Sequence, residues 1–322
     1  MDQVRKDIGL QLDVYNLEFP YCAKSISIEN YQFDRVENYQ EELQKLQFPI
    51  ARHSEFSIRA NTGGHSITAK LYVQNSEAES ILYPHSDSAT ALDDILVLLS
   101  LMTGRSVFAE KSNTDSNEPK MISADTRIYK WGGSLRASIP FKRKNVESKS
   151  LDYPFGHYDI GFEESVNEIY ALIKSQKWKK RYQNAFFLIL TREAFSTYSV
   201  ESTFIQCWTI WEHLFSILNQ NWLPVSQLHR IGSAEKIAFL LFEFILNGKN
   251  DEQTRKRIET LSTIRNKLVH FGRFPDKDTV VNDAVLFIRL TEQIVARILG
   301  LPPSDVFNTM EKLEEFLQQN NA

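Results

Sequence analysis

The residues with the clearest chemical potential lie in one segment near the end of the chain, Ile258–Gly272, which contains Arg265, Asn266 and His270. A histidine imidazole gains or loses a proton near neutral pH, so it can act as a general acid or base. An arginine guanidinium keeps its charge and presents a planar set of donors that matches a phosphate group. Together these residue types suit proton transfer beside a bound phosphate without a protein-held metal.

The same segment predicts an amphipathic helix, because its apolar residues recur at helical spacing, at positions 258, 261, 264, 268 and 271. At about 100° per residue, Asn266 and His270 share the opposite, polar face. Arg265 and His270 diverge by about 140°. One helix therefore does not bring this Arg and His close together. Two copies related by a two-fold axis could line a single cleft with both Arg–Asn–His sets, which suggests a homodimeric site.

The elements that position this segment are expected to form two domains, since the chain has 322 residues and a typical domain has about 150. Before residue 150, short and often alternating apolar runs such as 56–59 and 66–73 predict strands. Asn61–Gly64 lies between these two runs and predicts a hairpin turn. Thr90–Thr103 has helical periodicity and is followed by Gly104, a plausible C-cap. We predict an α+β domain over residues 1–150, with mostly antiparallel strands and one packed helix.

The second domain, residues 151–322, is predicted to be an all-α bundle with short connections. Glycines and prolines separate its helical windows, as expected of helix ends. The predicted windows are about 162–177, 179–197, 200–221, 232–247, 251–271, 278–299 and 304–319.

The charge of the chain gives no global basic field, because its net charge is −4. A local excess of positive charge nevertheless lies within Lys249–Arg273, where seven basic residues stand against three acidic ones. This segment could therefore bind a polyanion. The basic residues are Lys249, Arg255, Lys256, Arg257, Arg265, Lys267 and Arg273.

Composition and spacing also exclude several classes. Cys22 and Cys207 are the only cysteines and form no Cys-x-x-Cys pair, and the seven histidines show no zinc-site spacing. We therefore expect neither a metal nor another cofactor. No apolar run reaches the roughly 18 residues of a membrane span, and the N-terminus lacks the apolar core of a signal peptide. We expect a cytoplasmic protein that makes no membrane contact.

The pattern Arg265-Asn266-x-x-x-His270 resembles the Arg, polar residue, x3, His signature of the HEPN (higher eukaryotes and prokaryotes nucleotide-binding) superfamily of ribonucleases. Its context is similar to that of the Apea-like HEPN family: the pattern ends a helix in an all-α C-terminal domain and follows an amphipathic, Trp-rich helix, Phe204–Phe215. The strand-rich first domain, with its Leu-rich helix ending at Gly104, also resembles the N-terminal domain of that family.

The resemblance implies a metal-independent endoribonuclease that works as a homodimer. The neighbouring 2′-hydroxyl would attack the scissile phosphate, leaving a 2′,3′-cyclic phosphate and a 5′-hydroxyl. His270 would transfer the proton, Arg265 would stabilise the phosphate charge, and Asn266 would orient the imidazole or hold the phosphate. Glu212 would support Arg265. The RNA backbone would be positioned by Arg255, Lys256, Arg257, Lys267 and Arg273.

The resemblance also implies a setting. The RNA substrate would be transfer RNA, and the enzyme would act as a toxin in antiviral defence by abortive infection. A free ribonuclease must be held inactive, so the first domain would restrain the nuclease domain or sense a trigger that activates it. Its trigger would be a phage-derived protein or a small ligand.

Two other interpretations remain open. The HEPN fold could serve as a catalytically inactive adaptor that binds RNA or protein, or the helical domain could be unrelated to that superfamily. A histidine in the last turn of a helix is favoured by the helix dipole alone, and exposed arginines are common. The aromatic residues of the Trp-rich region could stack on bases, but their helical spacing favours core packing. These aromatics are Trp208, Trp211, Phe215 and Trp222.

Overall fold

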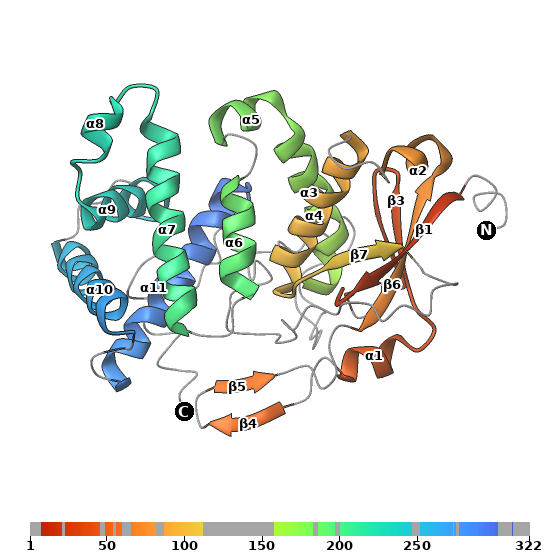
Figure 1. The fold of residues 1–322 in the computed structure, drawn as a ribbon, viewed down its shortest axis with the longest axis horizontal. Helices are drawn as coiled ribbons and strands as arrows, with labels where there is room; N and C mark the ends of the chain where they lie inside the picture. Colours follow the sequence, from red (N-terminus) through yellow and green to blue (C-terminus); the bar gives the residue numbers. More distant parts are fainter. Residues whose placement is uncertain are drawn as a thin grey trace, which may run out of the picture. The chain divides into compact units, whose positions relative to one another are not determined.

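The structure is a computed structural model, and Figure 1 shows its helices and strands. It describes residues 8–20, 23–45, 49–53, 56–59, 66–81, 87–111, 158–182, 186–196, 200–246, 252–272, 274, 277–301 and 311.

The strands are β1 (Ile8–Tyr15), β2 (Ser25–Ile28), β3 (Tyr31–Arg35), β4 (Pro49–His53), β5 (Phe56–Arg59), β6 (Ile67–Gln74) and β7 (Phe108–Lys111). The helices are α1 (Tyr39–Lys45), α2 (Asn75–Ile81), α3 (Asp87–Thr103), α4 (Tyr158–Lys174), α5 (Gln176–Tyr182), α6 (Phe186–Ser196), α7 (Val200–Asn219), α8 (Val225–Leu228), α9 (Ser233–Phe244), α10 (Glu252–Phe271) and α11 (Lys277–Ile298).

The first unit is built on a five-stranded sheet of order β2-β3-β6-β1-β7. All of its neighbouring strands are antiparallel, as predicted. The predicted hairpin between 56–59 and 66–73 is wrong in its pairing, because β5 pairs with β4. The reason is that β6 lies between β3 and β1, which occupy both of its edges. The proposed turn at Asn61–Gly64 lies outside the described residues.

Helix α3 contains the predicted Thr90–Thr103 helix, and it is buried on nearly every side from Ile95 to Thr103. A helix that is apolar all round belongs inside a core rather than on its surface. Gly104 ends it with a φ of 70°, and the N–H groups of Gly104 and Arg105 both donate to the Ser100 carbonyl. This C-cap was predicted correctly. The expectation of one packed helix is wrong, because α1, α2 and most of α4 also belong to this unit.

Helix α4 begins the helical part of the chain, but its residues up to Ala171 group with the first unit and those from Leu172 with the second. Its side chains contact the edge strand β2. The Ser27 N–H donates to Glu163 Oε1 at 3.2 Å, and Asn167 Nδ2 donates to the Ser27 carbonyl at 2.8 Å. These two hydrogen bonds occupy the backbone groups of Ser27 on the edge strand. The predicted boundary at residue 150 lies outside the described residues.

The second unit, from Leu172 onward, is helical in every element that the structure describes, as expected. The predicted 179–197 helix is two helices, α5 and α6, and the predicted 304–319 helix lies almost entirely outside the described residues. Figure 1 shows α7 running through the middle of this unit, and it contacts α5, α6, α9, α10 and α11. In the described ranges, no helix is long and apolar enough to cross a membrane.

An aromatic cluster joins α7 to α11. The ring of Phe287 lies 5.4 Å from Phe204, 5.1 Å from Trp208 and 5.6 Å from Trp211, measured between centroids. Trp211 Nε1 also donates a hydrogen bond of 2.8 Å to Thr291 Oγ1. The cluster therefore fixes both the spacing and the register of the two helices.

A buried ion pair stabilises the first unit just after α3. Arg105 Nη2 lies 2.7 Å from Glu18 Oε2, with side chains only 3% and 12% exposed. Removing one partner of such a pair leaves an uncompensated buried charge, which costs about 3–5 kcal/mol.

We therefore predict that Arg105→Met lowers the free energy of opening of the first unit by about 3 kcal/mol or more. Hydrogen–deuterium exchange of the β6 amides measures this free energy. The double variant Arg105→Met/Glu18→Gln is the control. Its free energy of opening should fall by less, because no charge is left unpaired. A loss below about 1 kcal/mol, the range of an exposed pair, would contradict the prediction.

Candidate functional site

The candidate site lies on the last two turns of α10. Ile258, Leu261, Ile264 and Leu268 are all buried, so the predicted apolar stripe holds the helix against its unit. Phe271 was predicted on this stripe, and that was wrong, because 74% of its surface is exposed. It stands at the edge of the stripe, about 80° from Leu261 at about 100° per residue, and it is the last helical residue. No neighbour covers it there.

Gly272 ends α10 in the left-handed region, with a φ of 69° and its N–H donating to the Leu268 carbonyl at 2.8 Å. This is the usual way in which a glycine terminates a helix. A Cβ placed on Gly272 would meet no atom within 4 Å, so the requirement for glycine is conformational rather than steric. His270 thus sits in the final turn of α10, two residues before the glycine that ends the helix.

Arg265 is half-buried, and its guanidinium turns toward the polar face. Arg265 Nη1 donates to Asn266 Oδ1 at 3.0 Å, while Arg265 Nε is buried without a hydrogen-bond partner among the described residues. Asn266 therefore binds the Arg265 guanidinium at Nη1 and leaves its Nε donor without a partner in the described structure. This arrangement leaves the arginine able to bind an anion.

Asn266 and His270 are both exposed, on the same side of α10, as their spacing predicts. In the part of the chain that the structure describes, no hydrogen bond joins Asn266 to His270, and none joins Arg265 to His270. A single chain therefore places the three predicted residues on adjoining faces without assembling them around one point.

The basic residues proposed to hold RNA have different surroundings. Arg255 is exposed, with its guanidinium carbon 5.5 Å from the ring centroid of Phe242. Lys256 pairs with Glu252 at 2.9 Å, but both side chains are more than 70% exposed, so this pair contributes little to stability. Lys267 is exposed and forms no ion pair with a described residue.

Arg257 is engaged in the structure of the unit. Its Nη2 lies 2.9 Å from Asp283 Oδ1 and joins α10 to α11, with both side chains partly buried. This contact positions α10 rather than leaving Arg257 for a phosphate. Arg273, the fifth of these residues, lies outside the described ones.

Glu212 does not contact Arg265 in the described structure. Its carboxylate instead accepts hydrogen bonds from Trp208 Nε1, at 3.1 Å, and from the Ser233 hydroxyl. Trp208 Nε1 also lies 2.6 Å from Ser233 Oγ. These bonds tie α7 to the start of α9, so the geometry gives Glu212 a structural role.

The aromatic residues divide in a way that their spacing did not predict. Trp208, Trp211 and Phe215 are buried, so the expectation of core packing is confirmed for them. It is wrong for Trp222, which is 67% exposed just after α7, because it follows the helix end rather than facing the core. Its indole N–H donates to Asn219 Oδ1 at 3.0 Å.

Sequence reasoning missed a second basic group. Lys177, Lys179, Lys180 and Arg181 all lie on the short helix α5, where they are exposed. The signal was available, because Gln176–Tyr182 contains four basic residues and no acidic one. The chain-wide charge and the larger Lys249–Arg273 cluster concealed it.

No group of three or more His, Cys, Asp and Glu side chains within the described ranges is arranged to hold a metal ion. Compared with protein-family models, with curated proteins and with solved structures, the chain gives no match. The functional interpretation therefore depends on the residues of the site and on the resemblance carried by them.

His213 on α7 supplies a pH-dependent contribution to stability. Burial lowers the pKa of His213 below its ordinary value of 6.5. The unfolded chain therefore binds a proton more readily than the folded one as the pH falls below about 6.5. Stability is lost over that range and levels off below the folded-state pKa.

We predict that His213→Gln reduces this loss. The free energy of unfolding, measured with urea and tryptophan fluorescence at about pH 7.5 and about pH 5, should change less with pH in the variant than in the wild type. His229→Gln, which replaces an exposed histidine, is the matched control. An unchanged pH dependence in His213→Gln would contradict the prediction.

Proposed function

We propose that this protein is a metal-independent endoribonuclease of the HEPN type, acting as a homodimer on RNA, with transfer RNA as the substrate class. The observation that carries the proposal is the end of α10, where an exposed histidine follows an arginine whose guanidinium is held by the intervening asparagine. The helical second unit and the Trp-rich α7 match the context that the resemblance requires.

The chemistry assigned to these residues is an internal transfer at phosphorus. The 2′-oxygen bonds to the phosphorus while its proton passes to a neutral His270 imidazole. The bond to the 5′-oxygen breaks, that oxygen takes a proton from a water molecule, and the His270 imidazolium then returns its proton to the solvent. The products are a 2′,3′-cyclic phosphate and a 5′-hydroxyl. Arg265 balances the negative charge that builds on the phosphate oxygens.

Two observations support a dimeric site. Arg265 and His270 lie on different faces of α10, so a second copy is needed to bring an arginine close to a histidine. Val269 and Phe271 flank His270 and are 52% and 74% exposed. Exposed apolar side chains beside a polar site are typical of a surface that another chain covers.

The biological setting is proposed from the resemblance alone. The enzyme would act as a toxin in antiviral defence by abortive infection, in the cytoplasm. The first unit would keep it inactive until a phage-derived protein or a small ligand binds there.

The alternative is a catalytically inactive HEPN adaptor that binds RNA or protein. One observation favours it: no hydrogen bond joins Asn266 to His270 in the described structure, so the asparagine does not orient the imidazole there. Both proposals require a dimer and a basic surface, but only the enzyme requires His270 to transfer a proton.

A complementation experiment tests the enzyme and its composite site together. We predict that His270→Ala and Arg265→Ala each reduce RNA cleavage at least about 100-fold, the range of a lost general acid–base group. Mixing the two variants should restore cleavage, because the mixed dimer contains one site with an intact arginine from one copy and an intact histidine from the other. Cleavage is measured in EDTA with and without lysate from phage-infected cells to supply the trigger, and the fragment ends are mapped by sequencing.

The control is a mixture of His270→Ala with a second preparation of itself, which should stay inactive. If the mixed variants do not regain activity although they exchange subunits, the composite site is wrong.

The dimer itself gives a separate prediction. Phe271→Glu should place a charge in the interface and convert the protein to monomers, measured by sedimentation velocity, and cleavage should fall with the dimer fraction. Trp222→Glu introduces the same charge at another exposed aromatic and should leave the dimer intact. A dimer that is unaffected by Phe271→Glu would contradict the placement of the interface.

A further inference from the structure

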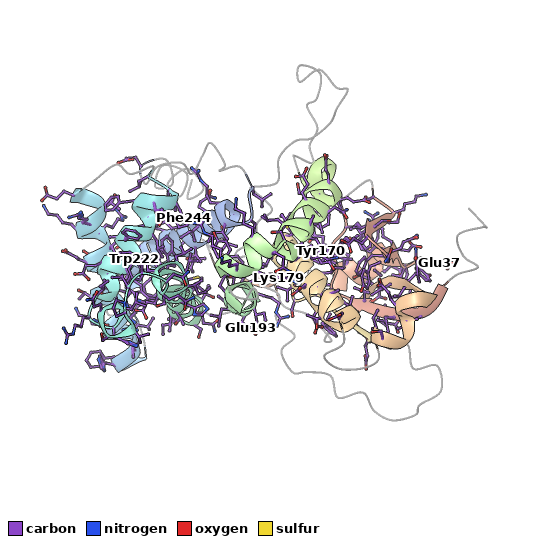
Figure 2. The ribbon with its side chains drawn as sticks, turned by 90° about the horizontal axis from the view of Figure 1, so that it is seen from above. Glu37, Tyr170, Lys179, Glu193, Trp222 and Phe244 are labelled. Atoms are coloured by element: carbon purple, nitrogen blue, oxygen red, sulfur yellow. The ribbon has the colours of Figure 1, made fainter. Side chains whose placement is uncertain are left out.

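Helix α5 presents a basic surface, formed by Lys177, Lys179, Lys180 and Arg181. All four side chains are exposed, and Lys179 is labelled in Figure 2. The helix contains no acidic residue, whereas the chain as a whole carries a net charge of −4. Positive charge is therefore concentrated here against the overall balance of the protein.

The helix is held firmly from its inner side. Ser175 caps it, with its hydroxyl accepting the Trp178 N–H at 3.2 Å. Trp178 and Tyr182 are buried, and the ring centroids of these two residues lie 5.7 and 5.5 Å from that of Phe187 on α6. Since the two aromatics occupy the inner face, the basic side chains must point outward.

The charges are not used for stability within the described structure. None of the described carboxylates forms an ion pair with Lys177, Lys179 or Lys180. Burial raises the pKa of Tyr182, which Arg181 opposes and Glu243 on α9 reinforces, so one carboxylate is close to this end of α5. One nearby acid does not balance four basic side chains.

Helix-dipole effects do not account for the pattern either. Basic residues in the last turn are stabilising, which covers Lys179, Lys180 and Arg181. Lys177 lies in the first turn, where a positive charge is unfavourable. The helix dipole therefore does not explain Lys177, which forms no ion pair in the described structure.

We infer that the α5 basic surface binds the phosphate backbone of RNA and forms a second contact separate from the site on α10. This inference rests on the proposed function for the identity of the polyanion. Lysines on flexible stems bind phosphates as point charges, without reading sequence. An anionic membrane is disfavoured because α5 exposes no apolar residue, which a helix lying on a bilayer requires.

The position of α5 fits this role. Helices α5 and α10 both contact α7, and Figure 1 shows them on opposite sides of it. RNA bound at one of these helices would leave the other helix accessible. An extended or folded RNA could therefore contact both. The α5 basic surface would then add affinity without entering the chemical step.

Salt-dependent binding tests the inference. In the His270→Ala background, a fluorescein-labelled single-stranded RNA is titrated with Lys177→Gln/Lys179→Gln/Lys180→Gln, and anisotropy is measured over a range of salt. The control, Lys24→Gln/Arg230→Gln/Lys236→Gln, removes three charges elsewhere. The slope of log affinity against log salt should fall by about 2 in the first variant, at about 0.7 for each lost phosphate contact, and much less in the control.

Equal slopes in the two triple variants would overturn the inference, as would a loss of binding to phosphatidylserine vesicles with no change in the RNA slope. Two further variants separate a loss of charge from misfolding of the triple variant. The charge-preserving variant Lys177→Arg/Lys179→Arg/Lys180→Arg should keep the wild-type slope. The single variant Lys180→Gln should lower the slope by about 0.7. Binding is measured apart from cleavage. A wild type that never cuts RNA, together with a reduced slope in the α5 variant, would refute the nuclease and leave this surface as an RNA contact.

Discussion

The packing of Phe287 against three aromatic rings of α7 is the constraint on which the helical unit depends. It places α11 against α7 in one register, and the Trp211–Thr291 hydrogen bond leaves the buried indole N–H satisfied. Once α11 is placed, Asp283 holds Arg257 and thereby sets the position of α10. These successive contacts, from α7 to α11 and from α11 to α10, position the candidate site. Its arginine and histidine emerge on different faces because α10 buries one stripe only.

The sequence was informative where local rules act alone. Helical periodicity predicted α10 and its buried residues Ile258, Leu261, Ile264 and Leu268, and glycine predicted the ends of α3 and α10. Local rules failed where a distant partner decides. Phe271 has the spacing of a core residue but no neighbour to cover it, and Glu212 is held by Ser233, which is 21 residues away. The periodicity of apolar residues along the sequence does not predict contacts between such distant residues.

The sheet shows the same limit. Alternation identified β5 and β6 as strands, but their order in the sheet was decided by competition: β6 pairs with β1 and β3 on its two edges, so β5 is left to pair with β4. The resemblance of the site to a ribonuclease signature supplied residue roles that the bare fold does not. It did not supply the α5 basic surface: the four basic residues stand in the sequence, but their outward direction follows from the burial of Trp178 and Tyr182 on the opposite face.

The most direct test of the central proposal is the chemistry of the cut ends. Purified wild-type protein and His270→Ala are incubated with total bacterial RNA in EDTA, with and without lysate from phage-infected cells to supply a trigger, and all fragment ends are sequenced. We expect discrete cuts ending in 2′,3′-cyclic phosphate with the wild type only. Cuts of the same kind by His270→Ala, or no cuts by the wild type under either condition, would contradict the assignment of a HEPN ribonuclease.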